Sequence, residues 1–294
     1  MIEIRNLTTY TLEEGLAIWN QGFEGYFSDM NFTMERWISR FALEGLSPEA
    51  SIVISVDGEA AGFVLSGIRM VNGKKVAWNG GTGVATKFRG QGLGTRLIEG
   101  ALDVYRQQGV QIAVLEAMVQ NERAIRLYEK MGYQTIDRVT FVSHRGTLSA
   151  DSFDAANLGG YTVHHGLPVE VAGLPFYQAM APWQAQWQGI RDGESIILYD
   201  KERPIGYALF KRTFNDSGQV SAVALYQCEA EAEHRDQEEI IHTLLGLVYA
   251  PRELECMRYT VNLPISNPTR MDALTRAGFT TLTEQVYMVR EMEG

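Results

Sequence analysis

The sequence predicts an α/β protein made of two tandem domains. The chain has 294 residues, and a domain usually holds roughly 100 to 200 residues. Signals for strands and for helices alternate along the first half. Helix-cap signals of the first half recur in the second half at a constant offset of 146 residues. Together these observations favour two copies of one α/β arrangement.

Three strands are predicted first, and turn residues separate them. Residues 51–56 and 61–68 are rich in apolar and β-branched side chains, and Asp57-Gly58 between them tolerates positive φ. A second turn at Asn72-Gly73 leads to a third strand over 75–86. The region therefore predicts an antiparallel meander.

The next elements are a helix, a strand, a second helix and a last strand. Apolar residues at helical spacing predict a helix from Leu93 that ends near Gly109. A short apolar strand is expected over 111–118. Asn121 can cap the second helix, and Gly132 can end it in the left-handed conformation. The last strand is expected over 133–142.

A segment without periodicity, residues 144–160, predicts the linker. We therefore expect a first domain at 1–146, a linker at 147–160 and a second domain at 161–294. The segment Asn121 to Gly132-Tyr133 is matched by Asn267 to Gly278-Phe279 at the offset of 146.

The glycine-rich segment Arg89-Gly90-Gln91-Gly92-Leu93-Gly94 falls on 235–240 in the second copy, where every glycine is lost. This pattern predicts one working site, in the first half. The acidic run of the second half lies beside the decayed segment and consists of Glu229, Glu231, Glu233, Asp236, Glu238 and Glu239.

Charge distinguishes the two halves in the same way. The chain carries 26 basic and 36 acidic side chains. Residues 1–148 hold 15 basic and 16 acidic side chains, whereas residues 149–294 hold 11 and 20. This balance argues against nucleic-acid or anionic-membrane partners, which need a surplus of Lys and Arg. An anionic cofactor would bind more easily to the nearly neutral first half.

Cysteine usage and the N-terminus bear on the compartment. Two cysteines cannot form a disulfide framework for a chain of this size. No apolar block has the length of a signal or of a membrane span. We expect a cytoplasmic protein. The histidines and cysteines show no metal-ligand spacing, so no metal is predicted.

The glycine-rich segment lies between a predicted strand and a predicted helix, where backbone N–H groups bind anions. A nucleotide triphosphatase would need Gly-Lys-Ser/Thr, which is absent. A dinucleotide fold would gain an acidic residue about 20 positions on, at Glu116. The glycine spacing opposes it, because Thr95 and Leu97 stand where the third glycine belongs.

A third family matches both segments. Arg89-x-x-Gly92-x-Gly94, with Val84 five residues earlier, is followed by Asn121-x-x-Ala124-x-x-Leu127-Tyr128-x-x-x-Gly132-Tyr133. This pattern resembles the GCN5-related N-acetyltransferase (GNAT) superfamily, and the second half resembles a degenerate copy, as in tandem members. The resemblance implies two mixed, mostly antiparallel, splayed sheets flanked by helices. In the first of them, acetyl-CoA would enter the gap between the two central strands.

The resemblance also implies which residues would bind acetyl-CoA. The backbone of three residues would border the pantetheine arm, the glycine-rich segment would wrap the pyrophosphate, and the cap of the later helix would adjoin the cofactor. These residues are Thr82, Gly83, Val84, Arg89, Gly90, Gln91, Gly92, Leu93, Gly94, Thr95 and Asn121. The run Gly80-Gly81-Thr82-Gly83 fits a bulged strand that a ligand approaches closely.

Acetyl transfer to an amine needs a base, an oxyanion donor and an acid. Glu116 would be the general base, directly or through water. Tyr128, seven residues after Asn121, would protonate the departing thiolate. The backbone N–H of Val84 would stabilise the oxyanion. At the offset of 146 these side chains become Asn262 and Leu274, so the second copy is expected to be inactive.

The acceptor is expected to be a primary amine on a small molecule or a peptide, and Tyr26 and Phe27 are candidates to contact it. The expected partners are acetyl-CoA and this amine, with a homodimer as one possible assembly. Two alternatives stay open. One is an acyl-CoA-binding regulatory protein without turnover, and the other is a nucleotide-binding oxidoreductase of the Rossmann type.

Overall fold

The computed structural model describes residues 1–153 and 160–292. The chain forms two compact units. The first contains Met1–Ile136 together with Val286–Gly294, and the second contains Asp137–Gln285. The C-terminal residues therefore belong to the first unit. In the described part of the chain, no helix is long and apolar enough to cross a membrane.

Up to its last helix, the first unit follows the predicted order of strands and helices. Its elements are β1 (Ile2–Asn6), η1 (Leu7–Thr9), α1 (Leu12–Gly22), α2 (Met34–Glu44), β2 (Leu46–Val56), β3 (Glu59–Val71), β4 (Lys74–Val84), η2 (Thr86–Phe88), α3 (Leu93–Gln107), β5 (Ile112–Met118), α4 (Glu122–Lys130) and the C-terminal part of β13 (Thr280–Glu291). The strand predicted over 133–142 is β6 (Gln134–Gly146), which belongs to the second unit from Asp137 on, and β13 takes its place beside β5. Both predicted hairpin turns are present, and all four of their residues have positive φ. The meander β2-β3-β4 is therefore confirmed.

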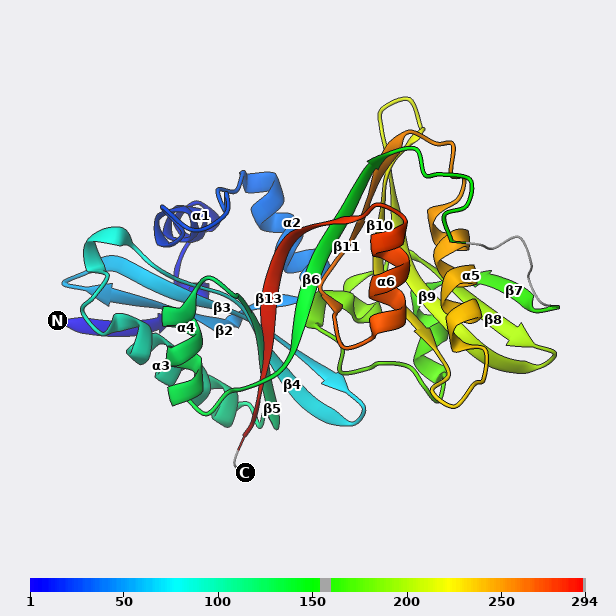
Figure 1. Ribbon diagram of the computed structural model, residues 1–294. Coiled ribbons are helices and arrows are strands. Elements are labelled where there is room, and N and C mark those ends of the chain that lie inside the picture. The colour runs from blue at the N-terminus through cyan, green and yellow to red at the C-terminus, as the bar shows by residue number, and fades with distance from the viewer. Residues whose placement is uncertain (154–159, 293–294) are drawn as a thin grey trace. The chain divides into compact units, whose positions relative to one another are not determined.

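The sheet of the first unit has the strand order β1-β2-β3-β4-β5-β13. The pairs among β1 to β4 are antiparallel, whereas β4 and β5 run parallel. Helices α1 and α2 cover one face of this sheet, and α3 and α4 cover the other (Figure 1). The predicted fold, a mixed and mostly antiparallel sheet flanked by helices, is confirmed. It is not the parallel sheet of a Rossmann fold.

One core of the first unit lies between the sheet and α3. The apolar residues Leu97, Ile98 and Ala101 of α3 pack against inward-facing residues of the strands. Val286 and Met288 of β13 belong to the same core. Residues near the end of the chain thus complete the core of the unit that contains its beginning.

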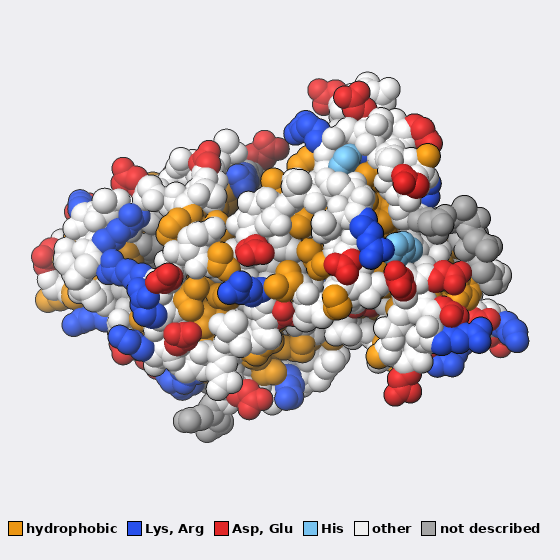
Figure 2. Space-filling model, in the orientation of Figure 1, with side chains coloured by type: hydrophobic (Ala, Val, Ile, Leu, Met, Phe, Trp, Pro, Cys, Tyr) orange, Lys and Arg blue, Asp and Glu red, His pale blue; other side chains and the backbone are white. Residues whose placement is uncertain are grey.

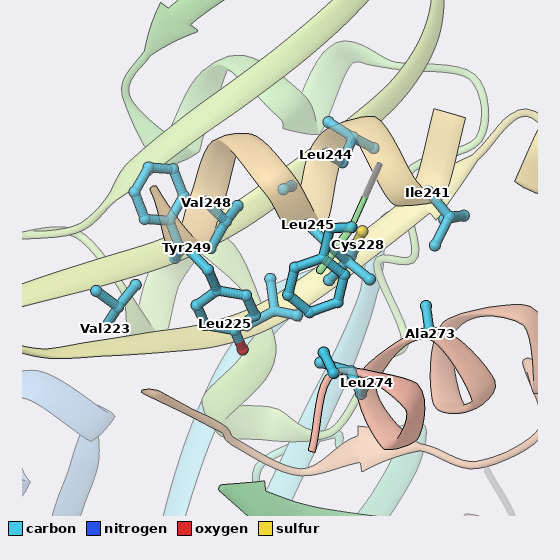
Figure 3. Packing of buried hydrophobic residues seen from close by; sticks show 14 of the residues in the cluster. Val223, Leu225, Cys228, Ile241, Leu244, Leu245, Val248, Tyr249, Ala273 and Leu274 are labelled. Carbon is cyan, nitrogen blue, oxygen red and sulfur yellow. The ribbon is translucent and has the colours of Figure 1, made fainter. Parts of the chain in front are cut away.

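The second unit repeats the arrangement. Its elements are β6 (Gln134–Gly146, from Asp137 on), β7 (Thr162–Gly166), η3 (Pro168–Gly173), η4 (Trp183–Ala185), η5 (Trp187–Gly189), β8 (Glu194–Asp200), β9 (Arg203–Phe214), β10 (Val220–Ala230), α5 (Gln237–Tyr249), β11 (Cys256–Thr260), β12 (Leu263–Pro264), α6 (Pro268–Arg276) and the first part of β13. The strand order is β6-β11-β10-β9-β8-β7, with β10 and β11 parallel. Helix α5 packs its apolar face on β10 and α6 (Figure 3). Three short 3-10 helices stand where the first unit has α1 and α2.

The predicted repeat is confirmed by its caps. Asn121 caps α4 and Asn267 caps α6, each by accepting a hydrogen bond from the backbone three residues on. Gly132 and Gly278 follow these helices with φ of 82° and 83°. The sequence pattern predicted both features, an Asn at each N-cap and a left-handed glycine after each helix.

The offset between the copies is not constant, and this corrects one prediction. Asn79 of β4 pairs with Leu115, and its counterpart Leu225 of β10 pairs with Thr260. The offset is therefore 145 in the strand, because one extra residue enters between Thr260 and Asn267. The position that corresponds to Glu116 is Val261, not Asn262. The second copy still has no carboxylate there.

The predicted linker at 147–160 lies partly outside the described residues, since 154–159 are not described. The boundaries 1–146 and 161–294 stay predictions about the repeat.

Candidate active site

A gap opens in the first unit between β4 and β5. The parallel ladder runs only from Val76 with Ile112 to Asn79 with Leu115, although both strands continue. The register against β3 skips Gly80, which forms a β-bulge. A bulge bends its strand and increases its local twist. The predicted bulge and the predicted splay of the central strands are both present.

The backbone of β4 beyond the bulge faces this gap. Ala85 N–H donates to the carbonyl of Ala61 over 2.9 Å. Because hydrogen-bonded and non-bonded positions alternate along an antiparallel pair, the amides of Val84 and Thr82 face away from β3. They therefore lie on the side where the ladder with β5 has ended.

Gly83 allows α1 to approach the strand closely. A Cβ atom at Gly83 would lie 2.7 Å from the Phe63 ring and 3.0 Å from the backbone of Gly22. The glycine therefore belongs to the packing between β4 and α1, and its backbone borders the gap.

The glycine-rich segment forms an open turn that leads into α3. Gly90 and Gly92 have φ of 82° and 78°, and Gly92 is the N-cap of α3 without a side-chain cap. Among the described residues, the backbone N–H groups of residues 90–94 have no hydrogen-bond partner. Such a set of free N–H groups at a helix N-terminus is suited to an anion.

The other residues of this segment support it in different ways. Leu93 is buried in the core under α3. A Cβ atom at Gly94 would lie 3.3 Å from Leu127, so glycine allows α3 and α4 to approach. The Gln91 side chain donates to the carbonyl of Lys87. Thr95 is half-buried in the first helical turn.

The Arg89 side chain holds the backbone around the gap. Its guanidinium donates to the carbonyls of Val84 at 2.9 Å, Glu24 at 2.6 Å and Gly22 at 3.2 Å. These bonds connect the loop to the end of α1 and to the end of β4. Sequence reasoning expected a charge for a phosphate, whereas the structure shows a positioning contact.

Exposed cations lie beside the segment. Figure 2 shows several Lys and Arg side chains gathered over the part of the first unit that holds the loop before α3 and the start of that helix. Arg96 is exposed in the first turn of α3, and no ion-pair partner for it lies in the described part of the chain. Arg96 was not predicted from the sequence, although its place two positions after Gly94 was a signal.

Tyr128 reaches the gap from α4. Its side chain is buried, with 7 % exposed, and its hydroxyl is hydrogen-bonded to the side chains of Thr82 and Asn79. Asn79 and Thr82 also bond each other at 2.9 and 3.1 Å. Burial raises the pKa of Tyr128 to about 12, although its bond to Thr82 partly opposes the shift. The phenol therefore holds its proton at neutral pH.

Asn79 is a site residue that sequence reasoning missed. It is a buried amide in an otherwise apolar stretch of β4. Buried polar side chains need partners, so this exception to the apolar pattern was a usable signal.

Glu116 reaches the gap from β5. Trp78 Nε1 donates to its carboxylate at 2.7 Å. Burial raises the pKa of Tyr287, and the negative charge of Glu116 raises it further. The Tyr287 phenol therefore lies close to this carboxylate. Ala113, Leu115 and Ala117 of β5 pack in the core under α3. Because side chains alternate along a strand, Glu116 points to the face covered by α1 and α2.

The two predicted catalytic side chains thus approach from opposite faces of the sheet. Tyr128 comes with α4 on one face, and Glu116 lies on the other. The gap between β4 and β5 separates them. A chain-like ligand in this gap could be reached by an acid from one side and by a base from the other.

Tyr26 belongs to the loop between α1 and α2. Burial raises its pKa, and a hydrogen bond to the Asn121 side chain opposes the shift. The charge of Tyr26 also raises the pKa of Tyr128, so the two hydroxyls are neighbours. The Phe27 ring packs edge-on against the Tyr26 ring, with 5.2 Å between the ring centroids, and Phe27 is 57 % exposed. The loop residues 20–31 line an open hollow of about 660 Å³.

The second unit has lost these features. Leu274 is buried where the first unit has Tyr128. The side chain of Gln227, beside the bulge of β10, donates to the carbonyl of Ala185 at 2.8 Å. Helix α5 begins with Glu238 and Glu239 in its first turn. Carboxylates at this helix N-terminus repel an anion where the first unit has free N–H groups.

No group of three or more His, Cys, Asp or Glu side chains is arranged to hold a metal ion within residues 1–153 and 160–292.

Comparisons with known proteins agree with this geometry. Residues 12–133 match the Acetyltransferase (GNAT) family. An uncharacterized N-acetyltransferase of Methanocaldococcus jannaschii is 28 % identical over 137 residues, which cover 45 % of this chain and 60 % of that protein. N-alpha-acetyltransferase 30 of Schizosaccharomyces pombe is 42 % identical over 50 residues, which cover 17 % of this chain and 33 % of that protein. The matched segments thus span less than two thirds of these two relatives.

A solved structure matches the whole length. The tandem GNAT protein from the clavulanic acid biosynthesis pathway has a TM-score of 0.58 at 16 % identity, and the match covers 100 % of this chain and 99 % of that one. At this identity the likeness concerns the fold. The family match therefore concerns residues 12–133, and the structural match shows that the chain as a whole has the fold of a tandem GNAT protein.

Proposed function

We propose that this protein is an acetyl-CoA-dependent N-acetyltransferase that transfers an acetyl group to a primary amine. The observation that carries the proposal is the gap between β4 and β5, with Tyr128 on one face and Glu116 on the other. The free N–H groups of residues 90–94 lie at the start of α3, on the α3 face of the same sheet.

The cofactor would bind through backbone groups. Residues 90–94 would donate to the pyrophosphate at the N-terminus of α3, with Leu93 and Thr95 anchoring the turn. Thr82, Gly83 and Val84 would align the pantetheine arm in the gap. Arg89 would keep the ends of α1 and β4 in place around it, and Asn121 would border the arm through its bond with Tyr26.

The reaction would then proceed from both faces. Glu116, directly or through water, would take a proton from the ammonium group of the acceptor. The amine nitrogen attacks the thioester carbonyl carbon and forms the C–N bond, while the carbonyl oxygen gains charge near the Val84 N–H. The C–S bond breaks, and Tyr128 gives its proton to the departing sulfur. The new amide nitrogen would release its remaining extra proton to water, and Tyr128 would regain a proton from water. Alignment of the two substrates would supply much of the rate.

The acceptor would enter beside the loop between α1 and α2, where Tyr26 and Phe27 line the hollow. A primary amine of a small molecule or of a peptide fits this proposal. The relative from Schizosaccharomyces pombe is named for N-alpha acetylation, which favours a peptide α-amine among the candidates. The second unit would bind no acetyl-CoA, because its helix α5 begins with carboxylates.

Calorimetry with acetyl-CoA and with NAD tests the cofactor. We expect acetyl-CoA to bind with one site per chain and NAD not to bind. Binding of NAD without acetyl-CoA would contradict the proposal. Binding of acetyl-CoA with no amine-dependent thiol release would instead favour an acyl-CoA-binding regulatory protein.

A further inference from the structure

Arg40, near the end of α2, is a largely buried cation that the proposed reaction does not use. Its side chain is 11 % exposed. Nε and Nη2 donate to the Glu44 carboxylate at 2.8 and 2.7 Å, and Nη2 also donates to the carbonyl of Gly80 at 3.0 Å. Its guanidinium carbon lies 4.8 Å from the Trp19 ring centroid and 5.9 Å from that of Trp78.

One nitrogen of this guanidinium has nothing to bind. Nη1 is buried, and no hydrogen-bond partner for it is found among the described residues. Aromatic faces stabilise the charge of a guanidinium, but they do not take up N–H groups that lie in its plane. A buried donor without an acceptor is unfavourable. An oxygen atom of a ligand would remove this cost.

Arg40 lies on the face where the acceptor amine is expected. Gly80 is the bulge that opens the gap. Trp78, over which the guanidinium lies, donates its indole N–H to Glu116. Arg40 and the proposed base therefore adjoin the same indole. An acceptor that brings its amine to Glu116 passes close to this arginine.

The charges restrict the kind of oxygen that fits. Glu44 already pairs with Arg40, and Arg69 donates to the Glu44 backbone carbonyl at 3.1 Å. Glu116 adds a second carboxylate beside Trp78. An acceptor with its own carboxylate would place a third carboxylate in this largely buried region, and its desolvation is costly. A neutral carbonyl oxygen can accept from Nη1 without adding charge.

We propose that Arg40 is a specificity-determining residue whose Nη1 binds the carbonyl oxygen of an α-amino amide, such as the first residue of a peptide. This inference rests on the proposed acetyl transfer. Alkylamines lack the oxygen, and free amino acids carry a carboxylate in its place. Both are therefore expected to be poorer acceptors.

Three amines that differ only in this group test the proposal: alaninamide, alanine and isopropylamine. We compare kcat/KM of the wild type and Arg40→Gln for each amine, so that the reactivity of the amine itself cancels. Loss of one hydrogen bond from a charged donor corresponds to a fold-change of roughly 10 to 100. Arg40→Gln should lower kcat/KM for alaninamide by this factor relative to isopropylamine. Equal losses for both amines would overturn the proposal, since they would indicate only a lost contact with Gly80.

Two further variants keep the test decisive. Arg36→Gln, on the exposed side of α2 over Phe32, is the matched control and should leave the ratio unchanged. If Arg40→Gln does not fold, Glu44→Gln replaces it: removal of the carboxylate should raise kcat/KM for alanine relative to alaninamide by about tenfold, the scale of one nearby charge. No change in that ratio would contradict the charge argument.

Binding separates this inference from the proposed function. If the wild type acetylates none of the amines, the proposed function fails. Alaninamide that still stabilises the wild type thermally, but not Arg40→Gln, would then leave the recognition role intact. Equal stabilisation of both proteins would overturn that role as well.

Discussion

Tyr128 is the residue whose environment carries the mechanism most directly. Burial raises its pKa to about 12, above the ordinary value near 10. An acid must hold its proton until the transfer, and a raised pKa maintains the protonated form throughout the neutral and mildly alkaline range. The bonds to Thr82 and Asn79 fix where the hydroxyl lies. We therefore expect no loss of rate from Tyr128 titration below about pH 11.

Replacement of Tyr128 by Phe removes the proton donor with little change in shape. We expect kcat to fall about 100-fold or more, the usual scale of general-acid catalysis, with KM for acetyl-CoA nearly unchanged. Steady-state thiol release measures both constants. Tyr133→Phe is the matched control, because Tyr133 is equally buried and its ring lies 5.9 Å from that of Tyr128. Equal losses in both variants would refute the acid role.

Replacement of Glu116 by Gln keeps an oxygen for the Trp78 N–H and removes the base. We expect kcat/KM for the amine to fall about 100-fold near neutral pH. The deficit should shrink as the pH approaches the pKa of the amine, because a free amine needs no base. Glu122→Gln, an exposed partner of Arg126, should behave as wild type. A deficit that is the same at every pH would speak against proton removal by Glu116.

Sequence and structure agree best for residues that belong to local motifs. Tyr128 and Glu116 were predicted as the acid and the base, and both border the gap, although their roles stay predictions. Arg40 was not predicted, because its contacts with Gly80 and Trp78 join elements that are distant in sequence. Asn79 was not predicted either, although a polar residue in an apolar strand was a usable signal. Arg89 was predicted as a phosphate ligand, yet its guanidinium donates to backbone carbonyls at the ends of α1 and β4. A local sequence pattern does not reveal such contacts.

At the level of elements, the turn before α3 combines two requirements. Gly92 must adopt positive φ, and the N–H groups that follow must stay free. A Cβ atom at Gly92 would meet nothing within 4 Å. An alanine there therefore disturbs the backbone conformation without a steric clash.

Gly92→Ala should weaken acetyl-CoA binding about tenfold and lower stability by about 1 kcal/mol, the cost of a side chain at positive φ. Gly109→Ala is the control at the other end of α3, with φ of 68° and equally open space. It should lose a similar stability and keep full affinity. Calorimetry and thermal unfolding report the two quantities. Equal affinities in both variants would show that the turn does not bind the cofactor.

The strands and helices of the first unit were predictable because their signals are local: Asp57-Gly58, Asn72-Gly73, the apolar face of α3 and the caps of α4. The extra residue beside Val261 was not. The constant offset between the helix caps hides this extra residue. A shorter segment around α5 compensates for the longer turn before α6, so the caps stay 146 residues apart. Only strand pairing reveals which residue occupies the place of Glu116.

For the molecule as a whole, the end of the chain matters to the unit at its beginning. Val286 and Met288 are buried in the core under α3, and β13 is the neighbour of β5. Sequence reasoning could not foresee this, since the contact spans most of the chain. Tyr287 lies between these residues and close to Glu116, so the same strand also borders the candidate site.

A chain that stops at Gln285 should lose the fold of its first unit. Exposure of the core left by Val286 and Met288 should cost several kcal/mol, on the scale of about 2 to 5 for a large buried side chain. A chain that stops at Glu291 retains β13 and is the control. Thermal unfolding and acetyl-CoA binding distinguish them. If the shorter chain binds acetyl-CoA as the control does, β13 is not needed for the site.

The central claim is that the gap between β4 and β5 moves an acetyl group from acetyl-CoA to a primary amine. Its most direct test incubates the full chain with acetyl-CoA and a panel of amines and amino-terminal peptides, and measures thiol release together with the mass of the amine. We expect one thiol to be released for each N-acetyl group formed, and we expect Tyr128→Phe to lose both thiol release and the acetylated product. If acetyl-CoA binds but none of the amines or peptides is acetylated, the central claim is contradicted.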